Sequence, residues 1–424
     1  MRKITIIFSI LILFCSLNAF TNAASMALAD SYSLRANGIE AGYWNPANLY
    51  DNQNKGYELY LLNTGISLSG NLLSVGLYNE INGDTLTIAK RKDILSRFDN
   101  SLQVNANFHY SLLGYSYNQH SISVGITTIA LGKISKKYLD LLLLGNSETY
   151  DKTYTFTKEN NSARALSYAD LTYAASTKTL SDIIPSLDYV KWLPDVKIGY
   201  SFSALIGISE ADVIKYDSHF STNDSTGIHL DQSIKGRYAL GGYGTKMKLG
   251  LESEVYKNLK VGLTFDNLIG FVKWIGKTKA AEFNASTDSI FIADLDDNFI
   301  TQSDTTYSIG SYETTLPVIF HFGALYNYDK ASFSLDWEQN LGSDAIYSNQ
   351  PEVSLGSQYY IRPYLPLRFG FGFGNIDRDH KFTYGIGYEG NKFTFNIGLE
   401  SVSQVFPNSD SKNVSFGITS KLKW

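Results

Sequence analysis

The residues whose types and spacing could bind a metal ion lie in one acidic stretch. Asp294, Asp296 and Asn298 occupy the first, third and fifth places of a calcium-binding loop. The pattern then fails, because Phe299 stands where the loop needs glycine and Thr305 stands where a bidentate glutamate belongs. The three residues are therefore a weak metal candidate, and a solvated acidic loop is the default interpretation.

Other chemistry-bearing residues show no spacing that is typical of catalysis. The sequence contains no HExxH, GxSxG or phosphate-binding loop, and its histidines lack ligand spacing, so we expect neither an enzyme nor a cofactor. Gly370, Gly372 and Gly374 lie in a strand-like stretch without the strand-turn-helix setting of a dinucleotide site. We expect these glycines, like His109 and His321, to face a lumen, with something packed against the glycines.

The N-terminus predicts export. Arg2 and Lys3 precede an apolar run, and small residues follow around Ala23 and Ala24, as in a signal peptide covering residues 1–24. The alternative, a membrane anchor, would need a longer run of about 20 apolar residues. Cys15 is the only cysteine and lies within the leader, so the mature chain must fold without disulfides.

Charge and hydropathy exclude two further classes of protein. The formal net charge of −5 gives no basic surface for nucleic acid, which we do not expect as a partner. The mean hydropathy is −0.14, and no long apolar run follows the leader, so helical membrane spans are not expected. A membrane-embedded form of this chain would have to be a barrel.

The dominant pattern after about Tyr57 is strict alternation of apolar and polar residues, which places successive side chains on opposite faces of a strand. Residues 196–203, 331–337, 367–374 and 393–399 show it most clearly. The phase slips by one residue at Leu112 and Leu113, which predicts a β-bulge. The expected fold class is all-β.

Alternation alone fits a soluble β-sandwich as well as a membrane barrel. Three features favour the barrel: strand-like runs of about ten residues, aromatic residues near the strand ends, and short turns such as Tyr328-Asp329-Lys330 and Glu389-Gly390-Asn391. We predict a transmembrane antiparallel β-barrel of about 14 strands, with 12 to 18 allowed. Its location would be the outer membrane of a Gram-negative-type bacterium.

The C-terminus carries a pattern that resembles the assembly signal of bacterial outer-membrane barrels. Residues 414–424 alternate to the end of the chain, which is aromatic. The residues predicted to form this signal are Phe416, Leu422 and Trp424, although phenylalanine is the commoner terminal residue. The alternative is an ordinary last strand. The implied partners are outer-membrane lipid and the barrel-assembly machinery.

Some segments interrupt the alternation. Helical spacing predicts short helices over 85–98 and 180–193, packed on the barrel rim. Lys and Arg are absent between Lys279 and Lys330, where aspartates accumulate, so we expect a long acidic outer loop there. Glycines 241, 242 and 244 predict a bend or a close approach of two backbones.

One segment behind the leader resembles a known family. Residues 27–51 include a Trp-Asn-Pro-Ala step that is similar to the N-terminal signature of the long-chain fatty-acid transporter-like barrels, including the PorV-like and uncharacterised branches. The matching residues are Ala36, Gly38, Glu40, Ala41, Trp44, Asn45, Pro46, Ala47 and Leu49. In that family the N-terminal segment folds inside a barrel of fourteen strands. Pro46 independently favours a turn over a strand here, since it lacks a donor for a β-ladder.

The resemblance implies a division of the chain and a function. Residues 25–55 would form a hatch inside a barrel of residues 56–424, with Trp44, Asn45, Pro46, Ala47 and Glu40 as plug or ligand residues. The protein would be a channel or binding protein for hydrophobic small molecules. Two alternatives remain open. A PorV-like barrel would bind secreted proteins through the loops 207–229 and 284–306, and a structural envelope barrel would do neither.

Overall fold

The computed structural model describes residues 22–52, 56–72, 74–82, 85–145, 153–185, 194–223, 227–290, 300–342, 350–374, 380–402, 404–406, 408–412 and 414–424. The predicted leader therefore lies almost entirely outside the described residues. Within them, no helix is long and apolar enough to cross a membrane.

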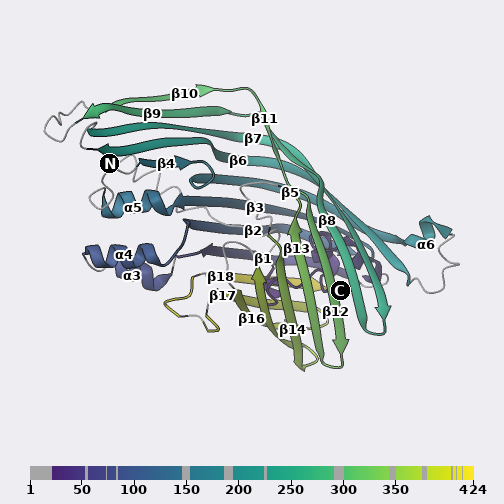
Figure 1. Cartoon of the computed structure of the whole chain (residues 1–424). Coiled ribbons are helices and arrows are strands. Elements are labelled where there is room, and N and C mark those ends of the chain that lie inside the picture. Colours follow the sequence, from purple (N-terminus) through teal and green to yellow (C-terminus); the bar gives the residue numbers. More distant parts are fainter. Residues whose placement is uncertain are drawn as a thin grey trace.

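A closed antiparallel ring of 14 strands forms the wall, as the alternation predicts (Figure 1). Each wall strand pairs with its neighbours in the ring, and β1 closes onto β18. The wall strands are β1 (Tyr57–Gly70), β2 (Ser101–Tyr117), β3 (His120–Ser135), β5 (Ser162–Thr179), β6 (Val196–Asn223), β7 (Gly227–Tyr256), β8 (Leu259–Trp274), β12 (Ile319–Tyr328), β13 (Ala331–Asn340), β14 (Glu352–Arg362), β15 (Leu365–Gly374), β16 (His380–Glu389), β17 (Phe393–Val402) and β18 (Val414–Lys423).

The two faces of the wall have the chemistry that the period-two pattern predicts. On β13, Phe333 and Trp337 are 53% and 40% exposed on the outside, while Ser334 and Asp336 are buried inside. The outer face is thus apolar and the lumen polar, which is the arrangement of a membrane barrel rather than of a soluble sandwich. The predicted bulge is present, because the register of β2 against β3 shifts between Ser111 and Leu113.

The two ends of the barrel differ. Tight turns join β2 to β3, β7 to β8 and β12 to β13 at one end, which also holds the start of β1 and the end of β18; we call it the short-turn end. Asp329 takes a φ of 49° in the predicted turn between β12 and β13. The opposite end, which we call the long-loop end, holds the long connections from β1 to β2 and from β3 to β5, whereas the long connection from β5 to β6 lies at the short-turn end.

An arm of β-sheet extends from the long-loop end (Figure 1). Strands β6 and β7 are 28 and 30 residues long. Their outer halves pair with β4 (Thr153–Thr157) and β9 (Lys279–Ile290), and β9 pairs with β10 (Thr301–Ser308). A short strand, β11 (Tyr312–Thr315), pairs with the end of β8.

The arm corrects two predictions. The segments 207–229 and 284–306 were expected to be outer loops, but their described residues are mainly strands. Strand β10 is exposed along its whole length, so it shows no apolar face that would mark it as a strand. Its main-chain ladder with β9 forms all the same, because backbone pairing does not require a buried side-chain face.

The helices at the long-loop end are α3 (Val75–Asn82), α4 (Ile88–Ser96) and α5 (Lys136–Leu144). These helices share an apolar core formed by Leu77, Ile94, Leu95 and Phe98. Helix α4 confirms the helix predicted within 85–98. The helix predicted over 180–193 is confirmed only for α6 (Leu180–Ile183), at the short-turn end, with Ile184 as its C-cap. Its expected packing on the rim is wrong, because Ile183 is exposed. Residues 186–193 lie outside the described residues.

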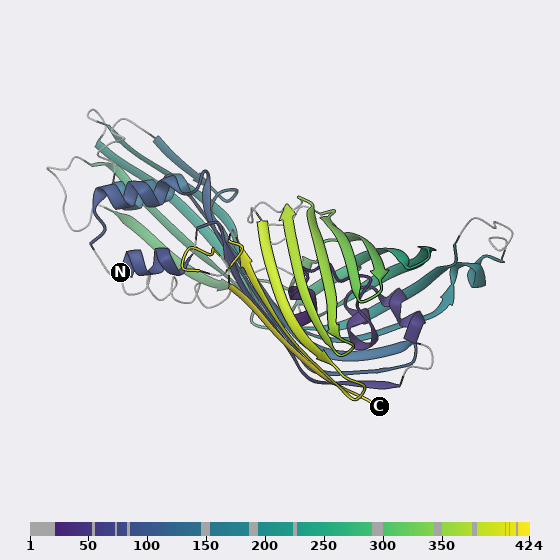
Figure 2. The ribbon, with the colours of Figure 1, turned by 90° about the horizontal axis from the view of Figure 1, so that it is seen from below.

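The N-terminal segment lies inside the ring, as predicted, and Figure 2 shows it enclosed by the wall strands. It consists of α2 (Ala23–Met26) and two 3₁₀ helices, η1 (Gly38–Gly42) and η2 (Pro46–Asn52). Most of its side chains are buried. We call residues 22–52 the hatch.

Candidate functional site

Wall glycines let the hatch approach the barrel closely. A Cβ on Gly370 would lie under 3.0 Å from the backbone of Leu28, and a Cβ on Gly199 would lie under 3.0 Å from Pro46 and Ala47. The expectation that Gly370 leaves room for a packed segment is therefore confirmed. Gly372 also faces inward, but the room beside it is taken by the side chain of Lys381.

The Trp-Asn-Pro-Ala step docks on β7. The Asn45 side chain accepts a hydrogen bond from Ala47 N at 3.0 Å and donates one to the carbonyl of Leu251 at 3.0 Å. Trp44 packs edge-on against Tyr32, with ring centroids 5.7 Å apart. Its indole N–H has no partner among the described residues. Pro46 opens η2, consistent with its predicted role in a turn.

Glu40 ties the hatch to the last strand. It is 1% exposed, accepts a hydrogen bond from the Tyr32 hydroxyl at 2.6 Å, and pairs with Lys421 on β18 at 3.1 Å. Removing one member of such a buried pair leaves an uncompensated charge in the lumen. Glu40 therefore stabilises the docked hatch, and nothing in its contacts shows a role in ligand binding.

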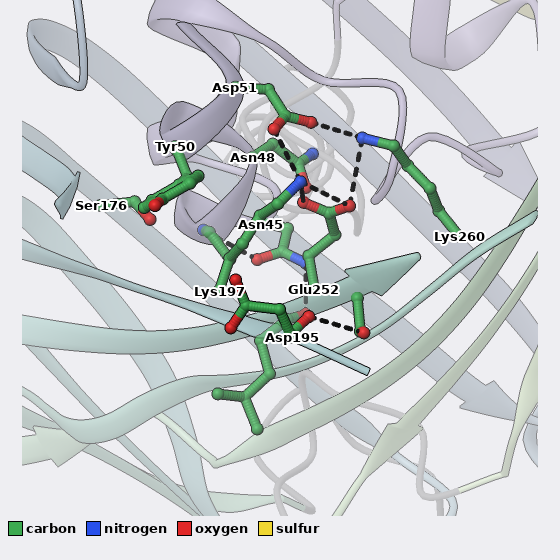
Figure 3. Close-up of polar contacts among 12 residues, drawn as sticks. Asn45, Asn48, Tyr50, Asp51, Ser176, Asp195, Lys197, Glu252 and Lys260 are labelled. Atoms are coloured by element: carbon green, nitrogen blue, oxygen red, sulfur yellow. Dashed lines mark hydrogen bonds and ion pairs between the residues drawn. The ribbon is translucent and has the colours of Figure 1, made fainter. Parts of the chain in front are cut away.

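A four-residue ionic cluster holds the C-terminal end of the hatch (Figure 3). Asp51 accepts hydrogen bonds from Lys197 at 2.6 Å and Lys260 at 2.5 Å, and Glu252 pairs with both lysines at 3.0 and 3.1 Å. Burial acts to raise the pKa of Asp51, but the two lysines outweigh it and hold that pKa below its usual range. We call these four residues the latch; sequence reasoning missed it.

A small cavity of about 50 Å³ lies on the long-loop side of the hatch. Gly42 and Tyr43 of the hatch line it, together with wall residues that include His109 and Lys246. The Tyr43 hydroxyl donates to Asp170 at 3.1 Å. The cavity is thus bounded by the hatch on one side, and both polar and apolar side chains line it.

A buried apolar cluster, which we call the collar, borders this cavity, since Ile129 and Tyr168 belong to both. Its members are buried and come from five strands and the segment before β12: Ile129, Leu166, Tyr168, Leu205, Ala239, Val272, Trp274 and Leu316. The Trp274 indole reaches across to Gly207 of β6, where a Cβ would lie under 3.0 Å from the ring. The close approach predicted at Gly242 and Gly244 is confirmed here, since both abut β8. Each strand contributes one or two members, so no single stretch of sequence reveals the collar.

A charged layer lies next to the collar on the long-loop side. Glu210 pairs with Arg164 at 3.0 Å, and it accepts a hydrogen bond from Thr314 at 2.7 Å. Thr314 in turn accepts the Trp274 indole N–H at 3.0 Å. The collar tryptophan is therefore held in place by a hydrogen-bonded chain.

On the other side of the hatch, a larger vestibule of about 300 Å³ opens at the short-turn end. Hatch residues Tyr32, Leu34 and Arg35 form part of its lining, and wall residues from β8, β12, β13, β14, β15 and β16 complete it. The lumen is therefore divided by the hatch into two spaces.

The remaining predicted site residues fall in three places. Phe416, Leu422 and Trp424 lie on the strand that closes the barrel, where Trp424 exchanges backbone hydrogen bonds with Tyr57; their role in assembly stays a prediction. Asp294, Asp296 and Asn298 lie outside the described residues, and the described part of the chain contains no cluster suited to a metal ion. His109 and His321 face the lumen, as expected.

Comparison with solved structures identifies proteins with a similar fold. No family model matches the sequence, and no curated protein matches it. The toluene transporter TodX of Pseudomonas putida matches with a TM-score of 0.51 at 11% identity, over 96% of this chain and 99% of that chain. The chain has the TodX fold.

Two further solved structures give similar matches. A TodX deltaS2S3 mutant, described as a monoaromatic hydrocarbon channel, has a TM-score of 0.53 at 11% identity, over 95% of this chain and 98% of that chain. A FadL homologue of Pseudomonas aeruginosa has a TM-score of 0.49 at 11% identity, over 97% and 99%. The resemblance drawn from the Trp-Asn-Pro-Ala segment is confirmed at the level of the fold.

Proposed function

We propose that this protein is an outer-membrane channel that passes an uncharged hydrophobic small molecule across a hatch-closed lumen. The observation that carries the proposal is the collar, because it is a buried apolar cluster beside a lumen whose wall is otherwise lined by serine, threonine, glycine and charged side chains. A pore for polar solutes would gain nothing from such an apolar cluster, whereas an apolar solute would leave water there.

The outer-membrane location rests on the chemistry of the wall. Its apolar outer face and polar lumen suit a lipid environment, and short turns in such barrels face the periplasm while longer loops face outward. This orientation places the arm outside the cell and the vestibule on the periplasmic side. The chain would reach this location after removal of its leader.

The proposed path runs from the collar through the small cavity to the hatch. A cavity of about 50 Å³ holds no organic solute, so passage requires the hatch to move. The ionic contacts that hold the hatch to the wall include the latch, the Glu40–Lys421 pair and the Asp30–Lys381 pair. The similarity in fold to the toluene transporter TodX makes toluene the first solute to test.

The test compares two substitutions at one collar position. Cells that produce the wild type, Leu205→Asn or Leu205→Met would be assayed for uptake of labelled toluene at equal surface levels of folded protein. Leu205→Met keeps the collar apolar and should retain uptake, while Leu205→Asn should reduce uptake several-fold. Equal uptake by the two variants, or no uptake above cells without the protein, would refute the proposal.

A second function, binding of a secreted protein, is favoured by the arm. Strands β6 and β7 are roughly three times longer than the 9–11 residues needed to cross a bilayer, so much of each projects beyond the wall. Removal of residues 213–236 should abolish co-purification of a partner while leaving toluene uptake unchanged. Unchanged co-purification would refute this second function.

A further inference from the structure

The vestibule at the short-turn end is lined by several charged side chains. Four cations line it, Arg35, Lys260, Lys330 and Arg368, against two carboxylates, Asp329 and Glu389. Arg368 is paired with Glu389, and Lys260 is paired with Asp51 at 2.5 Å and Glu252 at 3.1 Å.

Arg35 differs from these paired cations. It forms no ion pair among the described residues, and it donates hydrogen bonds to two hydroxyls: Nε to Ser334 at 3.1 Å and Nη1 to Ser332 at 2.6 Å. Its Nη2 is buried and has no acceptor. The carboxylate of Asp336, on the same strand as the two serines, accepts hydroxyls of Ser31 and Ser33 instead.

We propose that this vestibule binds a small carboxylate with a compact apolar body, held by the Arg35 guanidinium. A guanidinium presents its donors in a planar fork that matches a carboxylate, and both serines fix the orientation of that fork in advance. The lining of the vestibule is mostly polar, and Tyr32, Leu34, Leu325 and Tyr360 supply its smaller apolar part, which would face the body of the ligand.

The electrostatics favour such an occupant. A cation held away from bulk water without a counter-charge is costly, and the neighbouring Arg368 adds like charge to the same space. An oxyanion would supply the missing counter-charge. The site lies on the opposite side of the hatch from the collar, so the inference goes beyond the proposed passage of an uncharged solute.

The test is calorimetric titration of the purified full-length protein in detergent with sodium benzoate, acetate and inorganic phosphate, at constant ionic strength set with chloride. Benzoate should bind saturably with a stoichiometry of one, more tightly than acetate and phosphate. Arg35→Gln should weaken benzoate binding at least tenfold, and Arg35→Lys should weaken it less. Arg237→Gln is the matched control, since Arg237 lies far along the chain on β7 and pairs with Asp212 at 3.3 Å.

A faster-migrating unboiled band on a detergent gel would show that each variant is folded. If Arg35→Gln fails to fold, Ser332→Ala replaces it, because loss of that anchor should weaken benzoate binding several-fold without removing the charge. Saturable benzoate binding that Arg35→Gln leaves unchanged would overturn the proposal. Absence of binding to the wild type, or tighter binding of phosphate than of benzoate, would also overturn it. Toluene uptake does not enter this assay, so the two proposals fail independently.

Discussion

Substitution of Gly199 by alanine should loosen the hatch. A Cβ at this position would lie under 3.0 Å from backbone atoms of Pro46 and Ala47, whereas ordinary contact begins at 3.4 Å. The obstacle is backbone rather than a flexible side chain, so η2 must retreat from β6. Overpacking of this kind costs about 1–3 kcal/mol, which corresponds to about a 5- to 150-fold shift toward the undocked hatch.

Hydrogen exchange of peptides covering residues 44–52 measures this shift, because exchange in locally opening segments follows the opening equilibrium. Exchange in Gly199→Ala should be faster by the same factor. Gly236→Ala is the matched control: it also adds a methyl to a strand glycine, but the nearest atom to the new Cβ is 3.6 Å away. The reasoning would be refuted by equal exchange in the two variants.

Two further predictions concern the ionic contacts of the hatch. Lys421→Met leaves Glu40 buried without its partner and should lower the free energy of unfolding by about 3–5 kcal/mol. The temperature at which the folded band is lost on a detergent gel should therefore fall, and adding Glu40→Gln in the same chain should largely restore it. An unchanged temperature would contradict this prediction. For Asp51 the folded-state pKa is depressed, so the latch contributes stability above the unfolded pKa of about 3.9 and loses it as pH falls through the lower folded value. Single-channel openings should therefore stay rare from pH 7 to about pH 4.5 and become more frequent below about pH 4. The Asp51→Asn variant should open more often at neutral pH and show no such increase in acid. A wild-type channel whose opening frequency does not change in acid would refute the role of the latch in holding the hatch.

The barrel was predictable because the pattern that identifies each strand lies within that strand's own sequence. Each wall strand needs one apolar and one polar face, so residues such as Phe333 and Ser334 reveal the two faces without any knowledge of neighbouring strands. The hatch was predictable for a different reason: Pro46 excludes a strand, and its setting resembles a known family. Inward glycines such as Gly370 then follow from the need to place a backbone inside the ring.

The collar and the latch could not be predicted, because both depend on strand register. Asp51 and Lys260 are 209 residues apart in sequence, and no periodicity links them. In the sequence, Leu205 and Trp274 look like ordinary strand residues, and only the fold shows that they share one buried cluster. The arm was missed because β10 has two exposed faces, so its sequence carries the signature of a loop.

The most direct test of the account is the single-channel conductance of the protein in planar bilayers, before and after deletion of residues 27–50. The hatch fills the lumen between the small cavity and the vestibule, so the wild type should be closed almost all the time. The deletion should produce a large, steady conductance, provided that the variant still shows the folded band. A folded deletion variant whose conductance equals that of the wild type would contradict the central claim that the N-terminal segment closes this barrel.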